Sequence, residues 1–163
     1  MKILLPLVVL LFALTAHAQQ RPASTLVKIN GVGLGASYAE VIKKIGKPSK
    51  DVTGEGDECV GGKLRTLTYP GLVFEFHQEN DNPKKFYVGN FEVTSARWDV
   101  SGVKVGTASS VIKRKFGSPA INDGDRPGEK TWIYSLTEED GPGHLNFDVR
   151  KGLVVRISTF YIC

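Results

Sequence analysis

The sequence is poor in the features that mark specialised classes of protein. Only two of its 163 residues are cysteines, the formal net charge is +4, and one long hydrophobic run is present. The low cysteine content excludes a cysteine-dense mini-protein, and the single run excludes a protein that crosses a membrane many times. A composition of 41% hydrophobic and 23% charged residues also excludes collagen and a disordered charged tail.

The long hydrophobic run stands at the N-terminus and is typical of a secretory signal. Residues 1–18 contain one positive charge at Lys2, an apolar run over residues 3–14 and a closing Ala-His-Ala pattern that ends at Ala18. The run is shorter than the roughly 20 residues that a membrane-spanning helix needs. We therefore predict cleavage after Ala18 and a soluble, exported protein, periplasmic or secreted, with no membrane span. No cysteine lies near the cleavage point, so we expect no lipid anchor.

The two cysteines, Cys59 and Cys163, are the second constraint. An even pair in an exported chain predicts one intrachain disulfide bond. This bond would close a loop of about 105 residues and contribute roughly 4–5 kcal/mol in the chain-entropy model. Two free thiols or an intermolecular bond are the alternatives.

Two stretches of the chain, residues 31–48 and 102–119, resemble each other without a gap. The identical positions are Gly31 and Gly102, Val32 and Val103, Gly35 and Gly106, Lys44 and Lys115, Gly46 and Gly117, and Pro48 and Pro119. We interpret the match as a duplicated unit of about 65–70 residues. The predicted organisation is a signal peptide (1–18), an N-terminal segment (19–30) and two repeats (31–98 and 99–163).

Each of the two stretches predicts a short helix. Ser37 and Glu40 have the spacing of a capping box at the start of the first helix. One apolar stripe follows, formed by Tyr38, Val41, Ile42 and Ile45. Gly46 suits the left-handed position after a helix, and Pro48 prevents its continuation. The second helix begins less clearly, near Thr107, and ends at Gly117.

Alternating hydrophobic and polar residues after each helix predict antiparallel strands. The expected strands are residues 67–69, 72–76, 87–98, 132–136, 145–149 and 153–162, with turns at 70–71, 141–143 and 151–152. The predicted fold class is α+β: two tandem repeats, each a short helix plus an antiparallel β-meander, forming a shared or adjacent curved sheet. A unit of about 65 residues has a marginal core on its own, so we expect the two units to share an interface.

The order of Gly-x-x-x-Gly, short helix, Gly-x-Pro and β-meander resembles the small outer-membrane assembly lipoprotein domain called SmpA/OmlA or BamE. The tandem arrangement resembles β-lactamase inhibitor proteins, which are secreted two-domain binders with a concave sheet. The residues that carry the resemblance are Gly35, Val41, Gly46, Pro48, Gly106, Ile112, Gly117 and Pro119. The resemblance implies a sheet that binds another protein. The chain lacks the lipid-bearing cysteine of the assembly lipoproteins.

Motifs for catalysis and metal binding are missing. His77 and His144 are the histidines outside the predicted signal, and neither belongs to a zinc-binding spacing. The sequence has no Gly-x-Ser-x-Gly nucleophile motif, and the glycines of residues 31–35 do not match a phosphate-binding loop. The acidic loops do not match the twelve-residue calcium pattern. We therefore expect no catalytic residue, no metal and no cofactor.

Aromatic residues on the predicted strands are the remaining candidates for function. If one sheet face packs against the helices, aromatic side chains on the other face can anchor a partner; the alternative is that most of them belong to the core. The predicted anchors are Trp98, Trp132 and Tyr134, and the charged loop residues expected to steer association are Asp57, Asp125 and Glu139.

These residues predict a non-catalytic binding module of the inhibitor, immunity or envelope-assembly type. The expected partner is another protein, with no role for nucleic acid. The basic residues 113–115 allow weak contact with an anionic surface. Two alternatives stay open: a small exported hydrolase that uses His77 or His144 as a general base, and a purely structural envelope domain.

Overall fold

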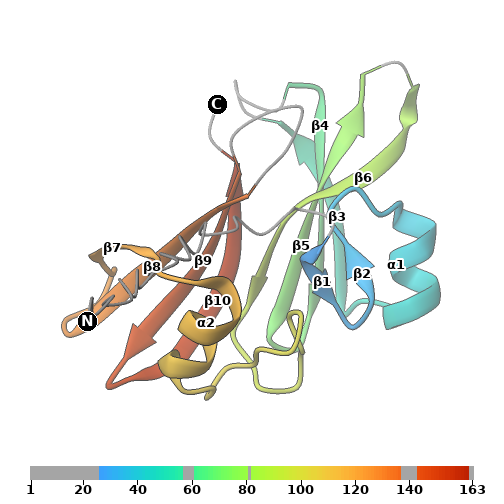
Figure 1. The fold of residues 1–163 in the computed structure, drawn as a ribbon. Coiled ribbons are helices and arrows are strands. Elements are labelled where there is room, and N and C mark those ends of the chain that lie inside the picture. The colour runs from blue at the N-terminus through green and yellow to red at the C-terminus, as the bar shows by residue number, and fades with distance from the viewer. Residues whose placement is uncertain (1–25, 57–60, 81, 137–142, 162–163) are drawn as a thin grey trace, which may run out of the picture.

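The computed structural model describes residues 26–56, 61–80, 82–136 and 143–161 (Figure 1). These parts of the chain contain two helices and ten strands. In chain order they are β1 (Lys28–Ile29), β2 (Val32–Gly33), α1 (Tyr38–Ile45), β3 (Lys50–Glu55), β4 (Lys63–Tyr69), β5 (Leu72–Glu79), β6 (Asn82–Val93), α2 (Ser109–Phe116), β7 (Ala120–Asp123), β8 (Glu129–Leu136), β9 (Gly143–Arg150) and β10 (Leu153–Tyr161). Neither helix has the length and apolar character needed to cross a membrane.

The predicted signal peptide (1–18) and both cysteines, Cys59 and Cys163, lie outside the described residues. Signal cleavage, export and the disulfide bond therefore stay predictions.

The predicted α+β class is wrong, because the chain is mostly β. Strands account for 56% and helices for 14% of the described residues. Two helix-plus-meander units are not found; the described chain forms one antiparallel eight-stranded sheet, in the order β3-β4-β5-β6-β10-β9-β8-β7, and a separate two-stranded sheet, β1-β2. The physical reason is that each helix has eight residues and buries very few of them: Val41 in α1, and Ile112 and Phe116 in α2. Most of the core therefore comes from the strands.

Both helices end where their local sequence predicts, but only α1 also begins there; α2 begins at Ser109, two residues after the predicted start near Thr107. The Ser37 hydroxyl accepts a hydrogen bond from the backbone N–H of Glu40, and the Glu40 carboxylate accepts one from the backbone N–H of Ser37. This confirms the predicted capping box. Gly46 follows α1 with a φ of 96°, a value that disfavours other residues. The second helix has Ala108 at its N-cap and no side-chain cap.

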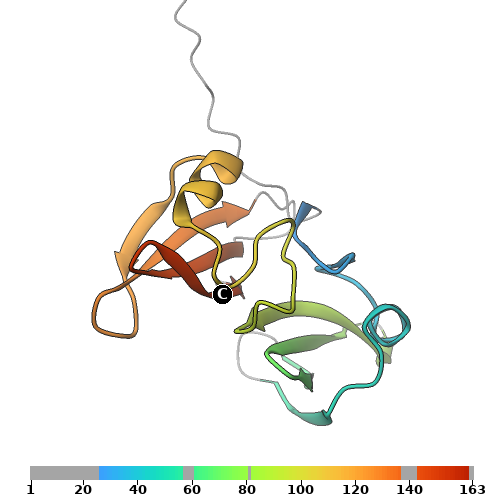
Figure 2. The same cartoon turned by 90° about the horizontal axis from the view of Figure 1, so that it is seen from below.

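Alternation along the strands gives the large sheet two different faces. Helix α1 packs on one of them through Tyr38, whose ring centroid lies 6.1 Å from that of Phe76 on β5. Helix α2 packs on the same face through Phe116, 5.6 Å from Phe147 on β9. Strands β1 and β2 and the segment of residues 94–108 lie on this side too (Figure 2). We call this the covered face and the opposite one the open face.

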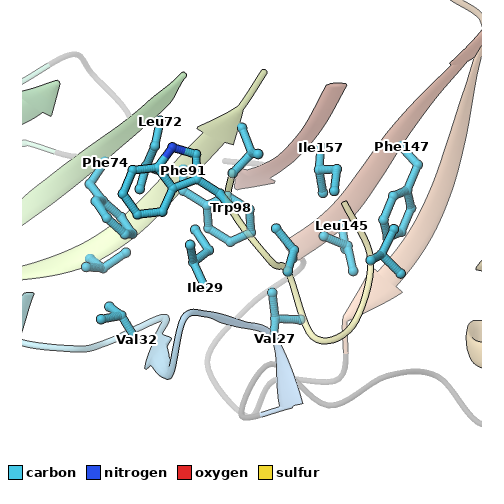
Figure 3. Packing of buried hydrophobic residues seen from close by; sticks show 14 of the residues in the cluster. Val27, Ile29, Val32, Leu72, Phe74, Phe91, Trp98, Leu145, Phe147 and Ile157 are labelled. Atoms are coloured by element: carbon cyan, nitrogen blue, oxygen red, sulfur yellow. The ribbon is translucent and has the colours of Figure 1, made fainter. Parts of the chain in front are cut away.

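The core lies between the covered face and the elements packed on it. Trp98 lies in the middle of this layer, with Phe74 of β5 toward one half of the sheet and Ile157 of β10 toward the other (Figure 3). Ile29 of β1 packs from below, and each of these four side chains is at most 4% exposed. One hydrophobic cluster therefore joins all parts of the described chain.

Strand boundaries differ from the prediction at the edges of the sheet. The two edge strands, β3 and β7, were not predicted, because all of their residues are exposed and no alternation marks them. Strand β6 ends at Val93, so Trp98 belongs to the connecting segment and not to a strand. The predicted turn at Pro70 and Gly71 is confirmed: Tyr69 pairs with Leu72 on either side of it.

Candidate site on the open face of the sheet

Two aromatic side chains are exposed on the open face. Tyr87 on β6 is 39% exposed and Phe160 on β10 is 58% exposed. Tyr87 pairs in register with His77 of β5, and Phe160 pairs with His144 of β9. The strands β6 and β10 are neighbours in the middle of the sheet and meet at Glu92–Val93 and Ile157–Ser158. Both aromatic residues lie beyond this contact, each on its own strand, and Tyr87 is bridged on its other side by Ser37. Exposed aromatic side chains of this kind are frequent anchors in protein interfaces.

Arg156 forms the centre of a charged network on the open face. Its Nε donates to Oδ2 of Asp148, and its Nη2 donates to Oδ2 of Asp125 at 2.6 Å. Its Nη1 lies 3.6 Å from Oε2 of Glu92 on β6. The Thr131 hydroxyl donates a further hydrogen bond to Asp148 at 2.6 Å. Arg156 is thus held by carboxylates from three separate segments of the chain.

The positive charge of Arg156 is maintained by its hydrogen bonds. Burial by itself lowers the pKa of Arg156, but the hydrogen bonds to Asp148 and Asp125 outweigh burial and raise it. Arg156 therefore stays charged at any physiological pH. The Asp148 side chain is 3% exposed, so the guanidinium supplies the opposite charge that a buried carboxylate needs.

Charge is distributed unevenly between the two sides of the described molecule. Around Arg156 the open face carries carboxylates from β5, β6, β9 and the loop before β8: Glu75, Glu92, Asp148 and Asp125. Basic residues collect in the last turns of the helices, on the covered side: Lys43 and Lys44 in α1, and Lys113, Arg114 and Lys115 in α2. Arg150, two residues after Asp148 on β9, is exposed on the same face, so these four carboxylates share the open face with two guanidinium groups.

The three anchors predicted from the sequence lie elsewhere. Trp98 and Tyr134 are each 4% exposed. Both donate a hydrogen bond to a backbone carbonyl oxygen: Trp98 Nε1 to that of Pro70 at 2.9 Å, and the Tyr134 hydroxyl to that of Gly117 at 3.0 Å. Burial raises the pKa of Tyr134 to about 12.

Burial leaves the Trp98 and Tyr134 side chains almost no surface that a partner could contact. Trp132 is half-buried and packs against the core, and its register partner Phe147 places it on the covered face. Of the three predicted anchors, Trp132 alone stays a candidate contact. The structure does not bring the three together on one surface.

The two histidines lie on the open face in different surroundings. His77 is 8% exposed, and its ring lies on Gly89, where a Cβ atom would come within 2.3 Å of ring atoms. This arrangement is close packing between neighbouring strands. His144 is half-buried, and within the described residues its Nδ1 has no hydrogen-bond partner. The described part of the chain contains no group of three or more His, Cys, Asp or Glu residues that could hold a metal ion.

Tyr87, Phe160 and Arg156 were not predicted as site residues, and for the last two the geometry of β10 gives the reason. A bulge between Val154 and Arg156 interrupts the pairing with β9. Simple alternation from the buried Val154 would place Arg156 and Phe160 on the covered face, but the bulge places both on the open face. Among the residues expected to steer association, Asp125 belongs to the Arg156 network, whereas Asp57 and Glu139 lie outside the described residues.

Comparison with known proteins gives little further information. No protein-family model matches the chain, and no curated protein matches its sequence. Among solved structures, an extracellular protein containing an SCP domain from Bacillus anthracis strain Ames is similar at 14% identity and a TM-score of 0.48. The match covers 78% of this chain and 44% of that protein. At this TM-score the likeness carries no argument about fold or function, and the resemblance to BamE and the β-lactamase inhibitors stays a prediction.

Proposed function

We propose that the chain is an exported, non-catalytic module that binds another protein through the open face of its sheet. The observation that supports this proposal is the pair Tyr87 and Phe160, exposed on a face that no other described element covers (Figure 2). These two residues replace Trp98 and Tyr134 as the anchors, because the latter are core residues.

The open face has the composition of a small protein interface. Exposed aromatic anchors contribute affinity when a partner removes them from water, and truncation of such an anchor typically costs about 2 kcal/mol or more. The carboxylates around Arg156 supply charge for steering and orientation. Since these carboxylates outnumber the guanidinium groups of Arg156 and Arg150 on the same face, they favour a partner whose contacting surface is basic, and binding should weaken as salt is added.

A hydrolase mechanism has less support from the open face. His77 is used in packing against Gly89. None of the hydrogen bonds and ion pairs of the described residues joins His144 to a carboxylate that could orient it as a general base.

The test is affinity capture with the immobilised chain from Gln19 onward and an envelope extract, with bound proteins identified by mass spectrometry. The variants are Tyr87→Ser and Phe160→Ser. Ile121→Ser is the matched control, because Ile121 is 53% exposed on edge strand β7, away from the open face.

The expected result is one protein that the wild type and Ile121→Ser retain and that either aromatic variant releases at least tenfold. Retention should also fall between low and high salt. Equal capture by all four chains, or no protein retained specifically by the wild type, would overturn the proposal.

A further inference from the structure

The two halves of the large sheet are joined by a very short ladder. Strands β6 and β10 pair through two residue pairs, Val93 with Ile157 and Glu92 with Ser158. The flanking interfaces, β5 with β6 and β9 with β10, each contain eight such pairs. We call the β6–β10 contact the seam. A strand interface of two pairs has few hydrogen bonds with which to fix an angle.

Immediately beyond these pairs, a side chain replaces the backbone ladder. The backbone N–H of Phe91 on β6 donates to the Thr159 hydroxyl at 3.0 Å, and this hydrogen bond is buried. A side-chain hydroxyl can rotate about its own bonds, so it tolerates a change in strand angle better than a backbone carbonyl does.

The segment that connects the two halves of the sheet, residues 94–108, forms hydrogen bonds to both of them. Near its start, the N–H of Thr94 donates to the carbonyl of Gly71 at 3.0 Å. Near its end, the N–H of Gly106 donates to the carbonyl of Val154 at 2.8 Å. The N-terminal strands belong to the first half, because the Ser101 N–H donates to the Lys28 carbonyl at 2.9 Å. Two bodies result: residues 26–103 and residues 104–161.

Among the described residues, the hydrogen bonds and ion pairs between these bodies lie at the seam. They are the β6–β10 ladder, the Phe91–Thr159 bond and the 3.6 Å contact between Arg156 and Glu92. The predicted Cys59–Cys163 bond, outside those residues, would join the bodies at a second point. Beneath the seam the contacts are apolar, with Trp98 and Ile29 of the first body facing Ile157 of the second (Figure 3). Apolar packing is non-directional, so it permits a small rotation that further hydrogen bonds would prevent.

We propose that the seam is a hinge about which the two bodies rotate as units. Tyr87 belongs to the first body and Phe160 to the second, so rotation changes the spacing of these residues and the shape of the open face. The hinge itself is independent of the proposed function. Its use in fitting the open face to a partner rests on that function.

The hinge predicts a pattern of native-state hydrogen exchange in the free protein. The seam amides, those of Phe91 and Val93 in particular, should exchange at least tenfold faster than amides in the middle of β5 and β9. Their exchange should depend little on added denaturant, as expected for an opening that exposes little surface. Thr159→Val should accelerate the seam amides together and leave the rates in β5 and β9 within twofold of the wild type.

A disulfide across the seam provides the second measurement. Glu92→Cys with Ser158→Cys joins register partners, whose spacing suits a disulfide. The matched control is Thr66→Cys with Glu75→Cys, which joins register partners inside the first body. The seam disulfide should slow exchange of the seam amides at least tenfold, and the control should not.

The outcomes separate the hinge from its use in binding. Seam amides that exchange only through global unfolding, with the full denaturant dependence of β5 and β9, would overturn the hinge. Seam amides that open locally while the locked variant captures partner as well as the control would support the hinge and refute its use in binding. If the wild type captures nothing, the proposed function fails, and the exchange result still decides the hinge.

Discussion

Arg156 on β10 and Asp148 on β9 face each other across the strand register, and the guanidinium covers a carboxylate whose side chain is 3% exposed. The cost of removing a carboxylate from water is met here by a charged donor and a hydroxyl donor, since Thr131 also bonds Asp148. The same guanidinium extends to Glu92 on the far side of the seam. One side chain therefore neutralises a buried charge and contributes to the contact between the two bodies.

Replacing Arg156 with alanine should destabilise the protein, because Asp148 would keep its burial and lose its opposite charge. Thr131 still donates to Asp148, and Arg156 is partly exposed, so we expect a loss of about 1–3 kcal/mol in the free energy of unfolding. Urea denaturation measures it. Asp125→Asn is the control: Asp125 is 74% exposed, and its loss should cost less than about 0.5 kcal/mol. Equal effects of the two substitutions would show that Asp148 does not depend on Arg156.

Gly89 is predicted to be intolerant of even the smallest side chain. A Cβ atom at this position would lie 2.3 Å from the ring of His77, which is buried and cannot move freely. We expect Gly89→Ala to lower the free energy of unfolding by about 1–3 kcal/mol, as measured by urea denaturation. Gly54→Ala is the control, since an added Cβ at Gly54 meets no atom within 4 Å.

The contact between residues 77 and 89 can be isolated with a double-mutant cycle. In a His77→Ala background the obstructing ring is absent. The loss of unfolding free energy caused by Gly89→Ala should therefore be less than half of the loss that it causes in the wild type. A cost that stays the same in both backgrounds would indicate a backbone effect at Gly89 instead of the clash.

Features that depend on neighbouring residues were predictable from the sequence. The capping box of Ser37 and Glu40 and the turn at Pro70 and Gly71 both involve contacts within a few residues, so short motifs suffice to find them. The edge strands β3 and β7 were not predictable in this way. A strand reveals itself by burying alternate residues, and these strands bury none.

The functional face required information that a single strand does not contain. Aromatic content alone does not separate Trp98, buried under the sheet, from Phe160, exposed on it. The separation depends on which face each residue occupies, and in β10 the bulge before Arg156 reverses the assignment that alternation gives. The prediction of an α+β fold was wrong for a related reason. The helical patterns do form helices, but the eight-stranded sheet supplies most of the core.

Tyr134 should make stability depend on pH in the alkaline range. Burial raises its pKa from 10.0 to about 12 in the folded state, so the folded state holds the phenolic proton more tightly than the unfolded state does. The resulting stabilisation is complete below pH 10 and is lost as the pH rises toward 12. Between pH 9 and pH 11 the ionisation of Tyr134 should lower the free energy of unfolding by about 1.4 kcal/mol.

The measurement compares urea denaturation of the wild type and Tyr134→Phe at pH 9 and pH 11. Phenylalanine has no ionisable proton. The free energy of unfolding of the variant should therefore fall by about 1.4 kcal/mol less than that of the wild type between pH 9 and pH 11. Tyr87→Phe is the control for removing a phenolic hydroxyl at an exposed position of the open face. If the free energy of unfolding falls equally in Tyr134→Phe and in the wild type, the Tyr134 hydroxyl is not buried in the folded protein.

Trp98 and Trp132 are the two tryptophans of the chain, so each single substitution leaves one fluorophore to report on its surroundings. Trp132→Phe leaves Trp98, which is 4% exposed and donates its indole N–H to the carbonyl of Pro70. Its emission should be blue-shifted in the native protein and move to that of a solvated indole on unfolding. Trp98→Phe leaves the half-buried Trp132, whose native emission should lie at longer wavelength.

The same two positions should differ in their effect on stability. Trp98→Ala removes a ring from the centre of the core and leaves the Pro70 carbonyl without its donor, so we expect a loss of about 3–5 kcal/mol. Trp132→Ala, at the margin of the core, should cost less than half as much. Denaturant unfolding followed by far-UV circular dichroism gives both values, because this signal does not require tryptophan. A solvent-like emission from Trp98, together with equal losses of unfolding free energy for Trp98→Ala and Trp132→Ala, would show that Trp98 is exposed. Trp98 would then again be a candidate anchor.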